Sequence, residues 1–139
     1  METFQLKKDV VLFGVQANSF PGGVQQAWQA LYKLSPTTTT RNFYGISHGS
    51  KDGSIVYRVC VEEVFPGEAE SLGCERFVLP QGEYIGETVQ NFMQQIEKIG
   101  EAFQTLLARN DYDRAGSCVE RYLNANDVVC MIKKATVSL

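Results

Sequence analysis

The chain has 139 residues, of which 44% are hydrophobic and 21% are charged. This composition excludes a disordered chain, and the length suits one globular domain better than two, so we treat residues 1–139 as a single domain. The formal net charge is −3, and the Lys and Arg side chains are scattered along the sequence. A direct nucleic-acid partner is therefore not expected, because phosphate binding needs clustered cations.

The N-terminal stretch METFQLKKDVVLFGV lacks the charged start, long apolar run and small-residue cleavage site of a secretory signal. No apolar run approaches the roughly 20 residues that a membrane-spanning helix needs. We therefore expect a cytoplasmic protein that does not enter a membrane. Neither C-x-x-C spacing nor a histidine at ligand spacing accompanies the cysteines, so the sequence predicts no metal site and indicates no cofactor. We interpret the cysteines as small buried hydrophobic side chains; they are Cys60, Cys74, Cys118 and Cys130.

The first half of the chain predicts a strand, a helix and a hairpin, in that order. Residues 10–15 form a short apolar run that is typical of a strand. Apolar residues spaced by three and four predict a helix over residues 24–34. Two further strand-like segments, 43–48 and 54–64, are separated by GSKDG, which is typical of a turn, so they predict a β-hairpin. We interpret residues 65–75 as a loop.

The second half repeats this order of elements. Residues 76–89 contain two strand-like pieces around a Pro-Gln-Gly turn, and we expect them to form a hairpin-like connection. Residues 91–109 have the clearest helical spacing, and Gly100 inside them indicates a bend or a close packing contact. The segments 118–123 and 128–135 are strand-like and flank the turn-like NAND, so they predict a second hairpin.

Strand, helix, strand and strand thus occur in each half, which is a repeat of pattern without clear sequence identity. The approximate pseudo-repeats are residues 4–65 and 75–136. Antiparallel hairpins with one helix per half indicate an α+β fold, with the helices on one face of an antiparallel sheet.

Glu120 is the most unusual residue of this pattern, because ionised carboxylates are poor strand formers and costly to bury. Strand alternation places it on one face with Cys118 and Tyr122. Two interpretations are open at this point. Glu120 is either an exposed carboxylate, alone or paired with Arg58 or Arg121, or it is placed to meet a ligand.

The order and spacing of the motifs resemble those of the gyrase-inhibitor-like small-molecule-binding domain, also called the bacterial transcription-activator effector-binding domain. The matching pieces are VLFGV, VQQAWQALYKL, FYGISH, IVYRVCVE, LPQGEYIGETV and VERYL, and they extend from about Phe4 to Ala135. The resemblance implies a tandem strand–helix–strand–strand repeat with pseudo-two-fold symmetry and a ligand cleft between the halves.

The resemblance also implies a site. In that family a Glu of the penultimate strand lies at the bottom of the cleft among aromatic side chains, and Glu120 matches it. The implied aromatic lining is Trp28, Tyr44, Tyr57, Tyr84, Phe92 and Tyr122. A carboxylate beneath aromatic rings offers a cation both charge pairing and attraction to the π faces. We therefore expect a stand-alone protein that captures amphipathic, cationic or aromatic small molecules.

Two alternatives follow from the same resemblance. Some relatives hydrolyse reactive, cyclopropane-bearing compounds, which would make Glu120 a catalytic base that activates water. Others inhibit DNA gyrase, which implies a module that binds a protein partner. Many members carry a helix-turn-helix segment, and none fits before Phe4 or after Leu139, so regulation of transcription by this chain alone is not expected. The sequence leaves ligand identity and oligomeric state open.

Overall fold

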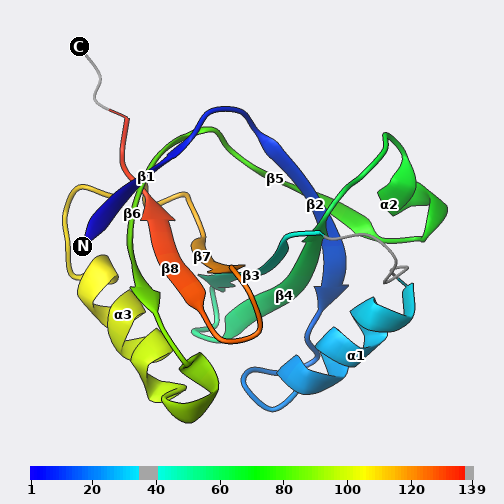
Figure 1. Cartoon of the computed structure of the whole chain (residues 1–139), viewed down its shortest axis with the longest axis horizontal. Helices are drawn as coiled ribbons and strands as arrows, with labels where there is room; N and C mark the ends of the chain where they lie inside the picture. The colour runs from blue at the N-terminus through cyan, green and yellow to red at the C-terminus, as the bar shows by residue number, and fades with distance from the viewer. Residues whose placement is uncertain (35–40, 137–139) are drawn as a thin grey trace. The chain divides into compact units, whose positions relative to one another are not determined.

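The computed structural model describes residues 1–34 and 41–136, and the chain divides into two compact units. Residues 9–79 form one, here called the 9–79 unit. Residues 1–8 and the chain from residue 80 onward form the other, here called the terminal unit because it contains both ends of the chain. Each unit is an antiparallel sheet with a helix packed on it, so the predicted α+β class is confirmed (Figure 1).

The sheet of the 9–79 unit has the strand order β5-β2-β4-β3. Its elements are β2 (Val10–Gln16), α1 (Val24–Leu34), β3 (Phe43–Gly49), β4 (Ile55–Glu62), α2 (Glu68–Ser71) and β5 (Glu75–Leu79). The helix predicted from apolar spacing has the same bounds as α1, and the β3–β4 hairpin is confirmed. Helix α1 buries Ala27 and Leu31 against Phe13 and Val59 of the sheet (Figure 1).

The sheet of the terminal unit has the strand order β1-β6-β8-β7. Its elements are β1 (Glu2–Leu6), β6 (Gly82–Val89), the 3₁₀ turn η1 (Phe92–Gln94), α3 (Glu97–Leu107), β7 (Cys118–Tyr122) and β8 (Val128–Lys133). The β7–β8 hairpin is confirmed. Helix α3 packs on this sheet (Figure 1). It buries Ala102 and Leu106 against β6, which contributes Val89 and Ile85, and against β8, which contributes Val128 and Ile132.

Strand β1 was not among the predicted elements, although Phe4 and Leu6 alternate with more exposed neighbours along it. It pairs with β6, with Phe4 opposite Tyr84. Two alternating apolar residues at a chain end indicate a strand only weakly. Whether such a segment forms a strand depends on a partner strand that is distant in sequence. Within the described part of the chain, no helix is long and apolar enough to span a membrane.

The predicted hairpin between residues 76 and 89 is wrong in its pairing. Both strands exist, but β5 pairs with β2, while β6 pairs with β1 and β8. Pro80 and Gln81 therefore join two strands that pair with other partners, instead of closing a hairpin turn. Local alternation identifies a strand, whereas the choice of partner is made by long-range packing.

The helix predicted over residues 91–109 begins later, at Glu97. The backbone N–H of Phe92 donates to the carbonyl oxygen of Asn126 at 2.9 Å, and Asn91 has the left-handed φ of 51°. The preceding turn is therefore held by the β7–β8 hairpin rather than by the helix. The apolar residues have helical spacing from Phe92 onward, but this tertiary contact prevents the helix from starting there.

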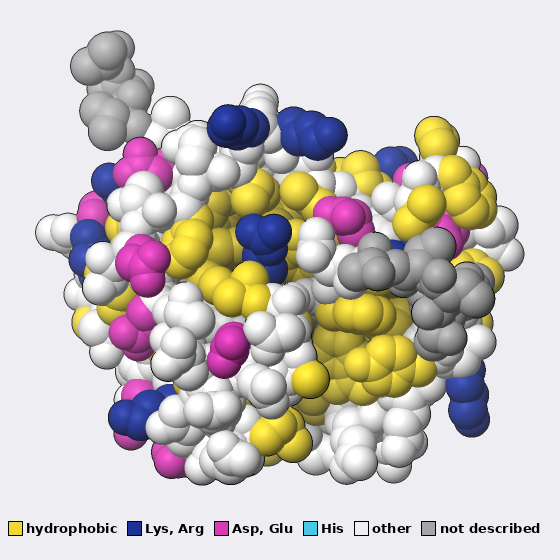
Figure 2. All heavy atoms as spheres, in the orientation of Figure 1, with side chains coloured by type: hydrophobic (Ala, Val, Ile, Leu, Met, Phe, Trp, Pro, Cys, Tyr) yellow, Lys and Arg dark blue, Asp and Glu magenta, His cyan; other side chains and the backbone are white. Residues whose placement is uncertain are grey.

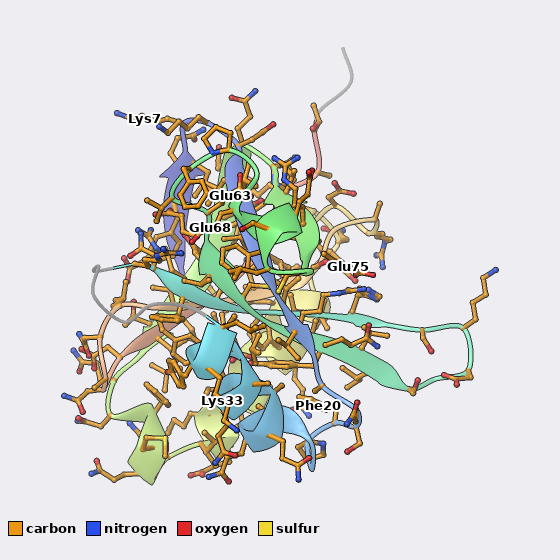
Figure 3. The ribbon with its side chains drawn as sticks, turned by 90° about the vertical axis from the view of Figure 1, so that its right-hand side faces the viewer. Lys7, Phe20, Lys33, Glu63, Glu68 and Glu75 are labelled. Carbon is orange, nitrogen blue, oxygen red and sulfur yellow. The ribbon has the colours of Figure 1, made fainter. Side chains whose placement is uncertain are left out.

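Residues predicted to form a loop contain α2, a single helical turn that side chains hold in place. Glu68 is paired with Arg41 at 2.8 Å, and both side chains are buried. The other Glu68 oxygen accepts the N–H of Val64 at 2.9 Å, and Glu63 accepts the N–H of Ala69 at 3.3 Å. Figure 3 shows Glu63 and Glu68 beside this turn. Such contacts leave no periodic signal in the sequence, because they join single residues across a loop.

Each sheet contains a glycine at which the neighbouring strand comes unusually close. A Cβ atom on Gly14 would lie 1.8 Å from the carbonyl oxygen of Val59, and one on Gly86 would lie 2.2 Å from that of Cys130. Only glycine fits such an approach. Gly100 is different, because a Cβ there meets nothing within 4 Å. The expectation that Gly100 marks a close packing contact is therefore wrong.

Alanine substitution should have opposite effects on stability at Gly86 and at Gly100, which both lie in the terminal unit. Gly86→Ala should lower the free energy of unfolding by about 2 kcal/mol or more, because the methyl group must push β8 away. Gly100→Ala should raise it by about 0.5–1 kcal/mol, because alanine is the better helix former and finds open space. Urea unfolding measures both. Equal stabilities for the two variants would contradict the close approach at Gly86.

Candidate functional site

Glu120 lies on β7 and is only 7% exposed. Its partner across the ladder is Cys130 of β8, which belongs to the apolar cluster under α3. Glu120 therefore lies on the face of the sheet that α3 covers. Arg121 follows it in the strand, is paired with Val129, and lies on the opposite face by alternation. The interpretation of Glu120 as an exposed strand carboxylate, or as the partner of Arg121, is excluded.

Two predicted site residues are linked to Glu120, Tyr122 directly and Phe92 through Tyr122. The hydroxyl of Tyr122 donates a hydrogen bond to Glu120 Oε1 at 2.5 Å. The ring of Phe92 packs edge-on against the ring of Tyr122, with centroids 5.4 Å apart and an interplanar angle of 65°. Glu120, Tyr122 and Phe92 thus form one continuous set of contacts inside the terminal unit.

The turn between β7 and β8 builds this arrangement. Asn124 Oδ1 accepts the N–H groups of Asn126 and Asp127 at 2.7 and 2.9 Å, and its amide nitrogen donates to the Asp127 carboxylate at 3.1 Å. Such a side-chain-to-backbone turn closes the hairpin and fixes its register. The carbonyl of Asn126 also binds the N–H of Phe92. One turn therefore sets the face of Glu120 and holds Phe92 near Tyr122.

Two thiols neighbour the carboxylate, and neither is a nucleophile. Burial raises the pKa of Cys130 to about 12, and the charges of Glu120 and Glu87 add to this effect. Burial raises the pKa of Cys118 to about 11, again with a contribution from Glu120. Both thiols remain protonated at neutral pH, where a nucleophilic cysteine needs its thiolate. The groups beside these thiols that can take part in chemistry at neutral pH are therefore the Glu120 carboxylate and the Tyr122 phenol, with the Glu87 carboxylate on the other side of Cys130.

Tyr84 is not on the face that holds Glu120. It is paired with Lys133, whereas its neighbour Ile85 packs under α3. Its ring is buried and its hydroxyl donates to the carbonyl oxygen of Pro80 at 2.7 Å. Neighbouring residues of β6 lie on opposite faces of the sheet. Which of them shares the face of Glu120 depends on the register of β6 and β7 against β8, and the sequence alone does not give that register.

Trp28 and Tyr57 lie in the 9–79 unit, on the side that α1 covers. The Trp28 indole packs against Tyr32 and Phe43, with ring centroids 6.0 and 6.1 Å away. The Tyr57 ring is stacked under Phe20 at 5.3 Å. Sequence reading missed Tyr32, Phe43 and Phe20. The i, i+4 spacing of Trp28 and Tyr32 was a usable signal, whereas nothing local links Phe20 to Tyr57.

Tyr44 occupies the opposite face of the same sheet. It is paired with Cys60 and is buried, while its neighbour Phe43 packs on the α1 side. The structure therefore brings Trp28 and Tyr57 to one face of the 9–79 unit and places Tyr44 on the other. That all three line a common site with Glu120 stays a prediction.

A polar groove of about 620 Å³ runs beside α3 in the terminal unit. Its lining residues are Glu2, Glu87, Thr88, Val89, Gln90, Gln95, Lys98, Glu101 and Thr105. None of the predicted site residues belongs to it. Within residues 1–34 and 41–136, no group of three or more His, Cys, Asp and Glu side chains is arranged to hold a metal ion.

Removing the side chain that closes the turn should weaken the hairpin. Asn124→Ala should lower the free energy of unfolding by about 1–2 kcal/mol, because it deletes several short hydrogen bonds of the turn. Asn110→Ala is the matched control, since Asn110 is exposed in the same unit and its side chain makes no hydrogen bond among the described residues. Urea unfolding should show the loss for Asn124 alone, and an equal effect at Asn110 would contradict it.

No family model matches this chain, and no curated protein matches it by sequence. Its fold is nevertheless shared with solved structures. The structure of SAV2435 bound to tetraphenylphosphonium has a TM-score of 0.61 and 15% identity, and the match covers 95% of this chain and 93% of that one. The integron cassette protein VCH_CASS2 from the mobile metagenome of Vibrio cholerae has a TM-score of 0.70 and 13% identity, covering 96% and 95%. A hydrolase from Listeria innocua has a TM-score of 0.59 and 14% identity, covering 96% and 91%.

Proposed function

We propose that this protein binds amphipathic organic cations that carry aromatic groups, and that Glu120 is the anionic anchor for them. The observation that carries the proposal is a carboxylate only 7% exposed in a strand, on the face beneath α3. A buried carboxylate is costly unless hydrogen bonds or a positive charge compensate it. The Tyr122 hydroxyl supplies one hydrogen bond, and a bound cation would add a favourable charge pair.

Aromatic rings beside the carboxylate support the same ligand class. Phe92 and Tyr122 form an edge-on pair next to Glu120, and aromatic faces attract organic cations more strongly where water is excluded. The neighbour SAV2435 was solved with tetraphenylphosphonium, a cation surrounded by four phenyl rings. We extend that ligand class to this chain as part of the proposal.

Tetraphenylphosphonium is the probe that tests the anchor, by isothermal titration calorimetry. The wild type should bind it, and Glu120→Gln should weaken the affinity by about tenfold to a hundredfold, because the amide keeps the shape and removes the charge. Glu87→Gln is the matched control. Glu87 flanks Cys130 on the other side of β8 and carries the same charge, so its loss should leave the affinity nearly unchanged.

The two variants also locate the ligand. Unchanged affinity in Glu120→Gln together with a loss in Glu87→Gln would assign the cation to the polar groove beside α3 and refute the role of Glu120. Equal losses in both would indicate a general effect of net charge instead of an anchor. Absence of binding to the wild type would refute the proposed ligand class.

Hydrolysis is the second candidate function, favoured by the fold neighbour from Listeria innocua that is described as a hydrolase. Glu120 would accept a proton from a water molecule as the water oxygen attacks an electrophilic carbon. The Tyr122 hydroxyl, which already donates to Glu120, would hold the carboxylate in place. With cyclopropane-bearing electrophiles, the ring C–C bond would break as the new C–O bond forms. The electron pair of the broken bond would pass to a conjugated carbonyl group of the substrate, whose oxygen then takes up a proton.

Product analysis separates this candidate from simple binding. The wild type should convert such an electrophile to a water adduct, and Glu120→Gln should reduce the rate by about a hundredfold or more, because a general base is lost. Tyr122→Phe should cause a smaller loss. Mass spectrometry in ¹⁸O-labelled water detects the adduct. Turnover at full rate in Glu120→Gln would remove Glu120 from the mechanism.

A further inference from the structure

The ring of Tyr57 is buried under a phenylalanine that is itself half exposed. Tyr57 lies in β4 on the face that α1 covers and is 3% exposed. One side of its ring is covered by Phe20, with centroids 5.3 Å apart and an interplanar angle of 28°. Phe20 is 43% exposed. A core phenylalanine of the same unit, Phe13, is fully buried, so Phe20 covers the core without belonging to it.

The segment that carries Phe20 follows a fixed residue and forms a turn. The Ala17 N–H donates to the carbonyl of Tyr57 at 2.8 Å, whereas the Gly23 N–H donates back to the carbonyl of Ser19 at 3.0 Å, within the turn itself. Residues 18–22 are exposed. The backbone of Phe20 makes no hydrogen bond among the described residues. Figure 3 shows Phe20 in the loop that leads into α1.

The ring of Phe20 can therefore leave Tyr57 without breaking a backbone hydrogen bond. Its departure uncovers an aromatic face that is otherwise buried. An offset stack of this kind is a geometry that aromatic ligands also adopt on a tyrosine. A ligand ring that carries or adjoins a positive charge gains cation–π attraction to Tyr57, which the neutral Phe20 ring does not provide. Exchange of the two rings consequently favours aromatic cations over neutral apolar compounds.

We propose that Phe20 is a displaceable lid over Tyr57, and that the aromatic group of a cationic ligand takes its place in the stack. Tyr57 then provides a stacking subsite, and Phe20 determines how readily ligands reach it. The inference rests on the proposed function for its ligand class. Phe20 was not indicated by any feature of the sequence. In this proposal the Phe20 ring and the aromatic group of the ligand compete for the same face of Tyr57.

Truncation of the lid should strengthen binding. In calorimetric titration with tetraphenylphosphonium, Phe20→Ala should bind about fivefold to tenfold tighter than the wild type, because the free energy spent on opening the lid is removed. Stopped-flow measurement should show faster association. Phe65→Ala is the matched control. Phe65 is 53% exposed in the loop before α2, where Figure 2 shows apolar side chains at the surface, and it should leave the affinity unchanged.

A second substitution ties the gain to Tyr57. In a Tyr57→Leu background the stacking face is missing, so Phe20→Ala should no longer tighten binding. Phe20→Leu keeps an apolar cover without a π face, and it should bind between the wild type and Phe20→Ala. This variant also maintains the test if the alanine variant folds poorly, which thermal unfolding reports.

The outcomes separate the lid from the proposed function. Tight binding by the wild type with unchanged or weaker binding by both Phe20 variants would overturn the lid and leave the function standing. A gain that persists in the Tyr57→Leu background would overturn the stacking subsite. Absence of binding to the wild type would overturn the ligand class, and the lid with it.

Discussion

The register of the β7–β8 hairpin is the constraint on which the candidate site depends. Glu120 is paired with Cys130, and this pairing places the carboxylate on the face beneath α3. A slip of one residue would exchange Glu120 with Arg121 and turn every side chain of β7 to the other face. The turn from Asn124 to Asp127 prevents such a slip with hydrogen bonds from one asparagine. The position of a single charge therefore depends on a polar turn outside the strand.

The same face combines negative charge with apolar cover. Glu120 and Glu87 flank Cys130 on either side of β8, and both charges act on its thiol. The Tyr122 hydroxyl donates a hydrogen bond to Glu120. The negative charge of Glu120 on this face is the reason why a cation is proposed as the ligand, before any aromatic contact is considered.

Elements with a strong local period could be predicted from the sequence. The bounds of α1 were predicted, as were both hairpins, because apolar spacing and turn residues lie within a few positions of one another. The common face of Glu120 and Tyr122 also followed from alternation. The partners of β5 and β6 did not, since pairing is decided by packing between distant segments. Phe92 leaves its apolar helical pattern because Asn126 binds its N–H, and Phe20 reaches Tyr57 through a loop with no period.

Each compact unit carries one cysteine at the centre of its sheet, Cys60 in the 9–79 unit and Cys130 in the terminal unit. Burial raises the pKa of both to about 12. Alkylating reagents attack thiolates, so either sulfur reacts only when its own strands open to solvent. The alkylation rate of each cysteine therefore measures how often its own unit opens locally. Peptide mapping after timed alkylation would assign the separate opening free energies without any engineered substitution.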